Sequence, residues 1–422
     1  MMQTHPEPDI IQDGQGVNDE IIEKYNLSKD DIFYSTQDET YKSNFVGVVL
    51  RGERLLVSLP KHFKEKNKFI KEDYDIKKSD IHLIMDSINK SVLSKQNSDH
   101  ELKYSLDSNF PLNAYFNIYN YFAKYGLYHE ENQVVKPNQS GRISWKDTLI
   151  HSNKFISKGN IIFLPLLYKK KRINETIITE CMVSIINYTN MLLSDFMTLP
   201  DNSMLANRGI NNSIFNNKGV IHKLHEILSR TFKDINKDLL RNIIIFLEKV
   251  NFNKRNILDI KYYDFANTWE MAVQKYLCDY FVGINAQNEM EFNSNGPHKA
   301  FKKDNLHYNI VHKDWNIQPD HVAVDDNTKS VFLFDSKYYT KLNDINHKQF
   351  MYHIIYRYMY PGYHIFDRLI MPYEDESTNE RYVDIRKIKK ADTRQIFNCD
   401  VNVRIDITKL NMVKVLKNLV SR

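Results

Sequence analysis

The spacing of apolar residues in the first part of the chain predicts strands followed by helices. Two β-rich runs, at 45–50 and 55–59, surround the polar turn sequence Arg51-Gly52-Glu53-Arg54. This pattern predicts a β-hairpin. Apolar residues then recur at intervals of three and four, which predicts helices at 80–92 and 112–128.

The pattern changes in the middle of the chain after a polar stretch at 130–142. Residues 142–167 mix strand-forming and turn-forming types, whereas 176–193 and 221–252 carry apolar residues at helical spacing. We therefore expect a mostly helical middle region.

From about residue 254 the pattern alternates between helix and strand. The expected elements are a helix at 264–281, strands at 318–324 and 331–339, a helix at 346–360 and a strand at 368–371. This order predicts an α/β domain, a sheet with helices on its faces.

These patterns predict an α/β chain with three parts. Residues 1–130 form an N-terminal α+β region for partner or DNA binding, 131–253 a mostly helical middle region, and 254–422 the C-terminal domain. We also expect residues 1–250 to fold without the C-terminal domain and to bind DNA or a motor subunit. The basic cluster Lys169-Lys170-Lys171-Arg172 motivates this expectation.

The formal net charge of +5 is unevenly distributed. Residues 1–40 hold ten acidic and two basic residues, a balance of −8, so residues 41–422 carry +13. A basic body is attracted to polyanions such as DNA. Solvated lysines are the common alternative explanation, so the charge only supports a site that is found independently.

Cysteine usage and hydropathy indicate a soluble cytoplasmic protein. The three cysteines lie far apart and form no CxxC pair, so they predict neither a zinc site nor a disulfide framework. The N-terminus is polar and acidic, unlike a secretory signal. The longest apolar run, 161–167, is too short for a bilayer, which needs about 20 residues.

Candidate chemistry lies in the hairpin expected at 318–339. If the hairpin is symmetric about the midpoint between residues 327 and 328, paired residue numbers sum to 655 and Asp320 faces Asp335. Their Cβ atoms would then lie about 4.5–5.5 Å apart. Because strand side chains alternate, Asp335 and Lys337 share a face while Ser336 points away.

This arrangement, P-D-x(n)-D-x-K, predicts a metal site for phosphodiester hydrolysis. Two carboxylates at that separation repel each other unless a cation lies between them, and Mg²⁺ prefers such oxygen ligands. Lys337 can hold the attacking water or stabilise charge on a phosphate oxygen. The alternative is a surface pair of carboxylates, Asp320 and Asp335, with Lys337 as their salt-bridge partner.

Two helices add candidate residues to this site. Glu270 lies at the edge of the apolar stripe of the helix expected at 264–281, where it can be a third metal ligand or simply solvated. Gln349 and Tyr352 share a face of the later helix and could touch phosphate. Core packing for Tyr352 and a surface position for Gln349 are the plainer expectations.

Three sequence features resemble one family of nucleases. They are Trp269-Glu270-Met271, the hairpin from Pro319-Asp320 to Asp335-Ser336-Lys337, and Lys348-Gln349-Phe350-Met351-Tyr352. Gly141-Arg142-Ile143-Ser144-Trp145-Lys146-Asp147-Thr148 also resembles a G-x-I-x-W-x-x-T signature of that group. The chain thus resembles the LlaJI-type restriction endonucleases, relatives of the McrC nuclease subunit, over about residues 45–370.

The resemblance implies a C-terminal PD-(D/E)xK restriction-endonuclease-like domain that cuts double-stranded DNA. Asp320, Asp335 and Glu270 would bind Mg²⁺, or Mn²⁺ in its place, and Lys337 would be the catalytic lysine. One departure is Asp335, where the wider superfamily often has Glu. The resemblance also implies an oligomer with a separate McrB-like GTPase or ATPase subunit, since the chain contains no G-x-x-x-x-G-K-[ST] phosphate loop.

Two other functions remain open from the sequence. His307, His312, His321 and His347, near Asn309 and Asn346, could suggest a His-Asn-His nuclease, but the paired ββα-metal spacing is missing. A non-catalytic DNA-binding or assembly subunit of a restriction or phage-defence system is the non-enzyme alternative. The sequence indicates neither a DNA recognition sequence nor a dependence on base methylation.

Overall fold

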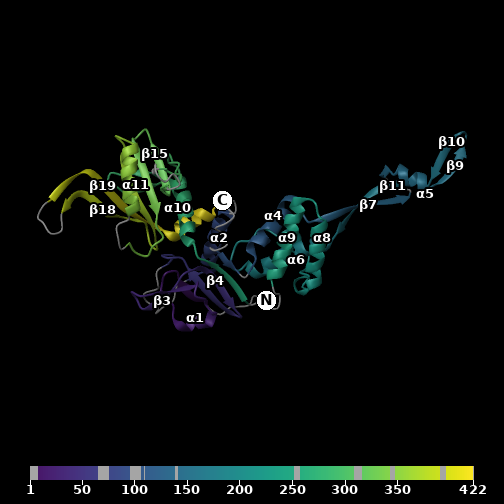
Figure 1. Cartoon of the computed structure of the whole chain (residues 1–422), viewed down its shortest axis with the longest axis horizontal. Coiled ribbons are helices and arrows are strands. Elements are labelled where there is room, and N and C mark those ends of the chain that lie inside the picture. The colour runs from purple at the N-terminus through teal and green to yellow at the C-terminus, as the bar shows by residue number, and fades with distance from the viewer. Residues whose placement is uncertain are drawn as a thin grey trace. The chain divides into compact units, whose positions relative to one another are not determined.

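The computed structural model describes residues 8–64, 76–95, 106–108, 110–137, 141–250, 257–307, 316–342, 347–389 and 396–421. The chain is mixed α/β, as expected (Figure 1). It forms two compact units: unit 1 is Met1–Ser108, Asp195–Thr198 and Asn256–Arg422, and unit 2 is Asn109–Ser194 and Leu199–Arg255. The three predicted ranges do not follow these units, and the roles assigned to the ranges stay predictions.

The N-terminal part of unit 1 is built on a five-stranded sheet of order β1-β5-β4-β12-β6. Its elements are β1 (Asp9–Gln12), α1 (Asp19–Tyr25), β2 (Ile32–Ser35), β3 (Thr40–Ser43), β4 (Val46–Arg51), β5 (Arg54–Leu59), α2 (Lys78–Lys95), β6 (Leu106–Ser108) and β12 (Ile257–Tyr262). The hairpin expected at 45–59 is confirmed as β4 and β5, which pair antiparallel.

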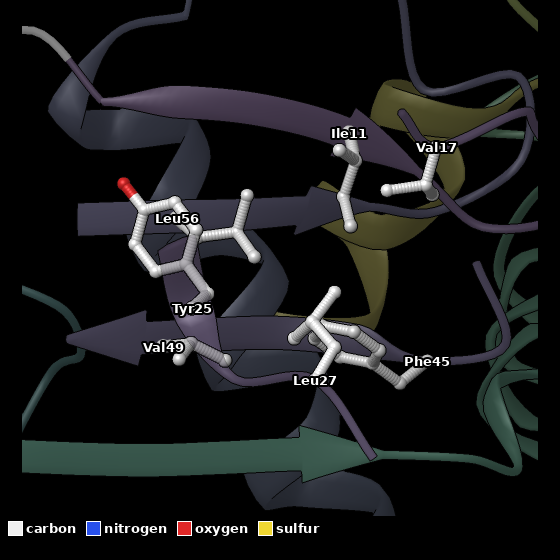
Figure 2. Packing of buried hydrophobic residues seen from close by; sticks show 7 residues of the cluster. All are labelled: Ile11, Val17, Tyr25, Leu27, Phe45, Val49 and Leu56. Carbon is white, nitrogen blue, oxygen red and sulfur yellow. The ribbon is translucent and has the colours of Figure 1, made fainter. Parts of the chain in front are cut away.

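The α1 region covers one face of this sheet with a compact apolar core (Figure 2). Tyr25 and Leu27 lie against Phe45, Val49 and Leu56, and all five side chains are buried. Burying a side chain of this size contributes roughly 1.5–3 kcal/mol to the free energy of folding, so this cluster provides much of the stability with which α1 packs on the sheet.

Strand β12 lies inside the N-terminal sheet although it follows unit 2 in the chain. It pairs with β4 on one side and with β6 on the other. Its buried Lys261 forms an ion pair with Asp31 at 2.8 Å. A chain that ends near residue 250 would lack this interior strand, which argues against the expectation that residues 1–250 fold without the remainder.

The approach of β12 to β4 is close at Gly47. Gly47 has a φ of +147°, and a Cβ atom at this position would lie 2.0 Å from the carbonyl oxygen of Ile260. Only glycine therefore fits beside the Ile260 carbonyl, and the glycine permits the pairing of β4 with β12.

The C-terminal part of unit 1 is a second five-stranded sheet of order β15-β16-β17-β19-β18. Its elements are α10 (Phe265–Tyr280), β13 (Phe281–Ile284), β14 (Met290–Phe292), β15 (His321–Asp325), β16 (Ser330–Ser336), α11 (His347–Met359), β17 (His364–Tyr373), β18 (Thr378–Lys389), β19 (Ile396–Asn411) and α12 (Met412–Val420). β16, β17 and β19 run parallel, whereas β15 and β18 are antiparallel to their neighbours. The sheet is therefore mixed.

Helices pack on both faces of this sheet. Tyr352 and Tyr356 of α11 pack with Val331 and Leu333 of β16. On the other face, Phe281 at the end of α10 packs edge-on against the rings of Phe332 and Phe334 at 5.1 and 5.5 Å. Alternate residues of β16 thus face opposite sides of the sheet. Because both sides are covered, every position of the run 331–334 is apolar.

Unit 2 contains a group of helices. They are α4 (Leu112–Tyr125), α6 (Ile177–Leu193), the 3₁₀ helix η1 (Ser203–Leu205), α7 (Ser213–Asn216), α8 (Lys218–Arg230) and α9 (Asp234–Lys249). Cys181 and Ile185 of α6 and Ile243 of α9 are fully buried. The single helix expected at 221–252 is observed as two helices, α8 and α9. Residues 231–233 between them are not helical.

Unit 2 also carries a long β-ribbon, which we call the arm, residues 129–175. It consists of β7 (His129–Pro137), β8 (Arg142–Ile143), α5 (Trp145–His151), β9 (Asn153–Ser157), β10 (Asn160–Leu164) and β11 (Leu167–Glu175). β7 pairs with β11 over nine residue pairs, and the β9–β10 hairpin lies at the far end from the helices of unit 2 (Figure 1). The expectation of a mostly helical region thus missed this ribbon.

The G-x-I-x-W-x-x-T sequence forms the corner of the arm. A Cβ atom at Gly141 would lie 3.0 Å from the carbonyl oxygen of Lys169, and the Oγ1 atom of Thr148 accepts a hydrogen bond from the backbone of Leu167 at 3.0 Å. The glycine and threonine therefore fix α5 against β11, while the Trp145 side chain stays exposed.

Candidate functional site

The register of the C-terminal hairpin is the one that the sequence predicts. His321 pairs with Phe334 and Asp325 with Ser330, so paired numbers sum to 655. Asp320 precedes β15 directly, and its Oδ2 atom accepts a hydrogen bond from the backbone N–H of Ser336 at 2.9 Å. The hairpin therefore brings Asp320 to the end of β16, where Asp335 lies.

Three carboxylates interact electrostatically at this end of the sheet. Burial and the negative charges of Asp335 and Glu270 raise the pKa of Asp320 to about 7. Asp335 is buried, and Glu270 is about one-third exposed on the second turn of α10. The fully buried Trp269, whose Nε1–H donates to the carbonyl of Ile370 at 3.4 Å, holds this part of α10 against β17.

Two lysines offset the charge of these acids. Lys337 forms an ion pair with Asp335, and Lys303 forms one with Glu270 at 2.8 Å. Burial pulls the pKa of both lysines down, but the neighbouring carboxylates, Asp320 among them, raise both pKa values overall. Lys303 lies in an irregular polar segment, and the sequence pattern gave no reason to single it out.

Lys337 is held in place through its backbone and its neighbour in the chain. Its N–H donates to the carbonyl of Ile370 at 2.8 Å. The following residue, Tyr338, is buried, and its hydroxyl accepts a hydrogen bond from the backbone N–H of Lys61 at 2.8 Å. The segment after β16 is thus attached both to its own sheet and to the N-terminal part of unit 1.

His321 joins α10 to the hairpin from a fully buried position. Its Nδ1 atom lies 2.6 Å from Gln274 Oε1, and its Nε2 atom lies 2.7 Å from Ser336 Oγ. Because Gln274 Nε2 donates to the carbonyl of Phe301 at 2.6 Å, its oxygen faces the histidine. Nδ1 therefore donates to Gln274, and Ser336 donates to Nε2.

This network links the helix that carries Glu270 to the strand end that binds Asp320. Burial lowers the pKa of His321 to about 3, so the ring is neutral near pH 7. Glu270 and Gln274 are four residues apart on α10, and Ser336 binds Asp320 through its backbone. No local sequence pattern indicates that His321 links the two carboxylate-bearing elements.

The helix after the hairpin corrects one expectation and confirms another. Gln349 is fully buried and not on the surface, because its amide donates to Asp367 Oδ1 at 2.5 Å and to the carbonyl of Leu333. Tyr352 is a core residue, as expected. Of the histidine and asparagine candidates, His312, Asn309 and Asn346 lie outside the described residues.

The donor chemistry of the site fits a hard divalent cation. Asp320, Asp335 and Glu270 supply carboxylate oxygens only, and the raised pKa of Asp320 reports a surplus of negative charge that a cation would offset. Within the ranges that the structure describes, no three His, Cys, Asp or Glu side chains are already grouped as ligands. In this structure Asp335 and Glu270 instead face lysines.

Comparisons with known proteins give a similarity to a solved structure. No protein-family model matches the chain, and no curated protein matches it. A solved structure of a half-complex from a tetradecameric assembly of Thermococcus gammatolerans McrB AAA+ hexamers with bound McrC is similar at 11% identity and a TM-score of 0.38, covering 98% of each chain. Because the sequence identity and the TM-score are both low, this similarity supports no functional argument, and any functional conclusion depends on the site residues. No described helix is long and apolar enough to cross a membrane.

Proposed function

We propose that the C-terminal part of unit 1 is a PD-(D/E)xK-type nuclease that hydrolyses the phosphodiester bonds of DNA with Mg²⁺ or Mn²⁺. The observation that carries this proposal is the half-buried Asp320, whose pKa is raised to about 7 by its partial burial and by Asp335 and Glu270, beside the ammonium of Lys337. Strongly perturbed carboxylates beside a lysine are more common at catalytic sites than on structural surfaces.

Each residue has a defined role in this proposal. Asp320, Asp335 and Glu270 hold the metal, which when bound polarises the phosphate and activates water. Lys337 places an ammonium at the phosphate oxygen on which charge develops. The His321 and Ser336 hydrogen bonds keep Asp320 at the end of β16.

The substitution Asp320→Asn tests the site. The amide keeps the size of the side chain but removes the charge, so we expect loss of divalent-metal binding and of plasmid nicking, with DNA binding largely retained. Asp326→Asn is the matched control, because Asp326 lies exposed in the turn of the same hairpin. Nicking by Asp320→Asn at the wild-type rate would show that the site is elsewhere.

The alternative is a DNA-binding or assembly subunit in which the acids only form ion pairs with Lys337 and Lys303. These pairs exist in the structure and give that alternative a specific basis. Metal-dependent nicking by the purified chain supports the nuclease. DNA retention in a magnesium-free gel shift, without nicking under any partner condition, supports the binding subunit.

A partner fits the surface of the arm. Ile156 and Ile161 in its terminal hairpin and Ile150 in α5 are 83%, 60% and 62% exposed, which is unusual for a monomer. We propose that the arm binds a separate McrB-like GTPase or ATPase subunit of a restriction or phage-defence system. The test mixes the chain with an McrB-like nucleotide hydrolase from the same genome and measures DNA cutting with GTP and with ATP.

A further inference from the structure

A pocket of about 530 Å³ opens beside the candidate carboxylates. Lys303, which forms the ion pair with Glu270, lines this pocket, and so does Gln318, two residues before Asp320. A volume of this size lies within the range of pockets that bind small ligands. The pocket therefore adjoins the reaction site without being part of the metal-binding group.

The charge of the pocket is opposite to that of the neighbouring acids. Its charged and titratable lining includes Lys303, His347 and Lys348, and no carboxylate is found among the described residues that line it. A phosphate group of DNA would be repelled by Glu270, Asp320 and Asp335 alone. The basic wall supplies the attraction that the carboxylates lack.

The remaining lining is apolar with amide groups. The ring of Tyr352 is nearly buried and belongs to the core beneath α11, and Ile317 packs against the same core. Met351 is 47% exposed beside them. Asn316 and Gln318 add amide donors and acceptors. An apolar floor with amides and a basic wall matches a flat heterocycle that carries a phosphate.

We propose that this pocket binds one unstacked nucleotide of the DNA next to the phosphate that is cut. A base within a duplex cannot enter a concave pocket, so the nucleotide must leave the stack or lie in a single-stranded segment. Its phosphate lies at Lys348 and Lys303, and its base lies over Met351 and Tyr352. This inference rests on the proposed nuclease function.

The test uses the full chain with Ca²⁺ in place of Mg²⁺ and two DNA probes. One is a paired duplex, and the other is the same duplex with a single bulged nucleotide. We expect about tenfold tighter binding to the bulged duplex, because stacking of one base on a side chain contributes that much. Met351→Asp should abolish this preference, and its exposed position makes misfolding an improbable explanation.

The basic wall has a separate readout. Lys348→Gln should reduce the slope of log affinity against log salt by about 0.7–0.9, the value for one lost phosphate contact. Lys417→Gln, an exposed lysine on α12 outside the pocket, is the matched control and should leave the slope unchanged. Equal affinity for both probes, or an unchanged slope in Lys348→Gln, overturns the inference.

Cutting assays separate this inference from the proposed function. If the chain nicks DNA but shows no preference for the bulged probe, the proposed nuclease function stands and the nucleotide-binding pocket is refuted. If the chain prefers the bulged probe and Met351→Asp abolishes that preference, but the chain cuts no DNA, the nucleotide-binding pocket stands and the proposed nuclease function is refuted.

Discussion

Replacing His321 by Phe should weaken unit 1 in a way that depends on pH. The phenyl ring fills the space of the imidazole but accepts and donates no hydrogen bond. Gln274 Oε1 and Ser336 Oγ then lose their partner inside the protein. Leaving one buried polar group unpaired costs about 1–3 kcal/mol, so the expected loss of stability near pH 7 is about 2–6 kcal/mol.

The pH dependence comes from the histidine itself. The pKa of His321 falls from its ordinary value of 6.5 to about 3 in the folded chain because of burial. Below pH 6.5 the unfolded chain binds a proton that the folded chain does not, so stability is complete above pH 6.5 and falls as the pH decreases toward 3. At 1.36 kcal/mol per unit, the 1.5 units from pH 6.5 to pH 5 remove about 2 kcal/mol.

The two effects predict a difference that shrinks in acid. The difference in the free energy of unfolding between wild type and His321→Phe should be about 2 kcal/mol smaller at pH 5 than at pH 7. The reason is that phenylalanine does not titrate. Hydrogen exchange of the β15 and β16 amides, corrected for intrinsic rates, measures this locally. His298→Phe, at an exposed histidine, is the control and should change stability by less than about 0.5 kcal/mol. A difference that is the same at both pH values would refute the reasoning.

Substitutions at Lys337 and at Gly47 test two further positions in unit 1. Lys337→Arg and Lys337→Ala should each reduce the rate of DNA cutting about a hundredfold or more, because a guanidinium cannot take the place of the ammonium. Cutting by Lys337→Arg at the wild-type rate would contradict the catalytic role of Lys337. Lys337→Ala should also lower the free energy of unfolding by about 3–5 kcal/mol, since Asp335 is left buried without its cation. Gly47→Ala should prevent the pairing of β4 with β12 and abolish soluble expression, because its Cβ would meet Ile260; Gly52→Ala, in an open turn, should remain soluble.

The hairpin was predictable because its information is local. A polar turn between two apolar runs defines a symmetric register, and the pairing of His321 with Phe334 confirms it. The proximity of Asp320 to Asp335 follows from that register alone. The position of Glu270 near Asp320 depends on a tertiary contact, which local spacing does not predict, and its role as a metal ligand stays a prediction.

Features that depend on distant pairing were not predictable. β12 pairs with a strand about 200 residues earlier, and local periodicity carries no information on such a partner. Gln349 looked like a surface residue because helical spacing marks polar residues as exposed, whereas the unpredicted Asp367 binds it in the interior. The arm carries mostly exposed apolar residues in β9 and β10 and a run of exposed basic residues in β11, and no core periodicity identifies such a ribbon.

The position of β12 also sets an order of events during synthesis. The N-terminal sheet needs Ile257–Tyr262, while Asn109–Arg255 hold all of unit 2 and are translated first. At roughly 5–20 residues per second, the ribosome makes the intervening segment of about 150 residues in roughly 7–30 s. Throughout that interval the edge of β4 at Gly47 is open to any other nascent strand, whereas unit 2 can already bury its helices. Premature termination inside unit 2 would thus release a chain with a permanently open sheet edge, the kind of product that aggregates.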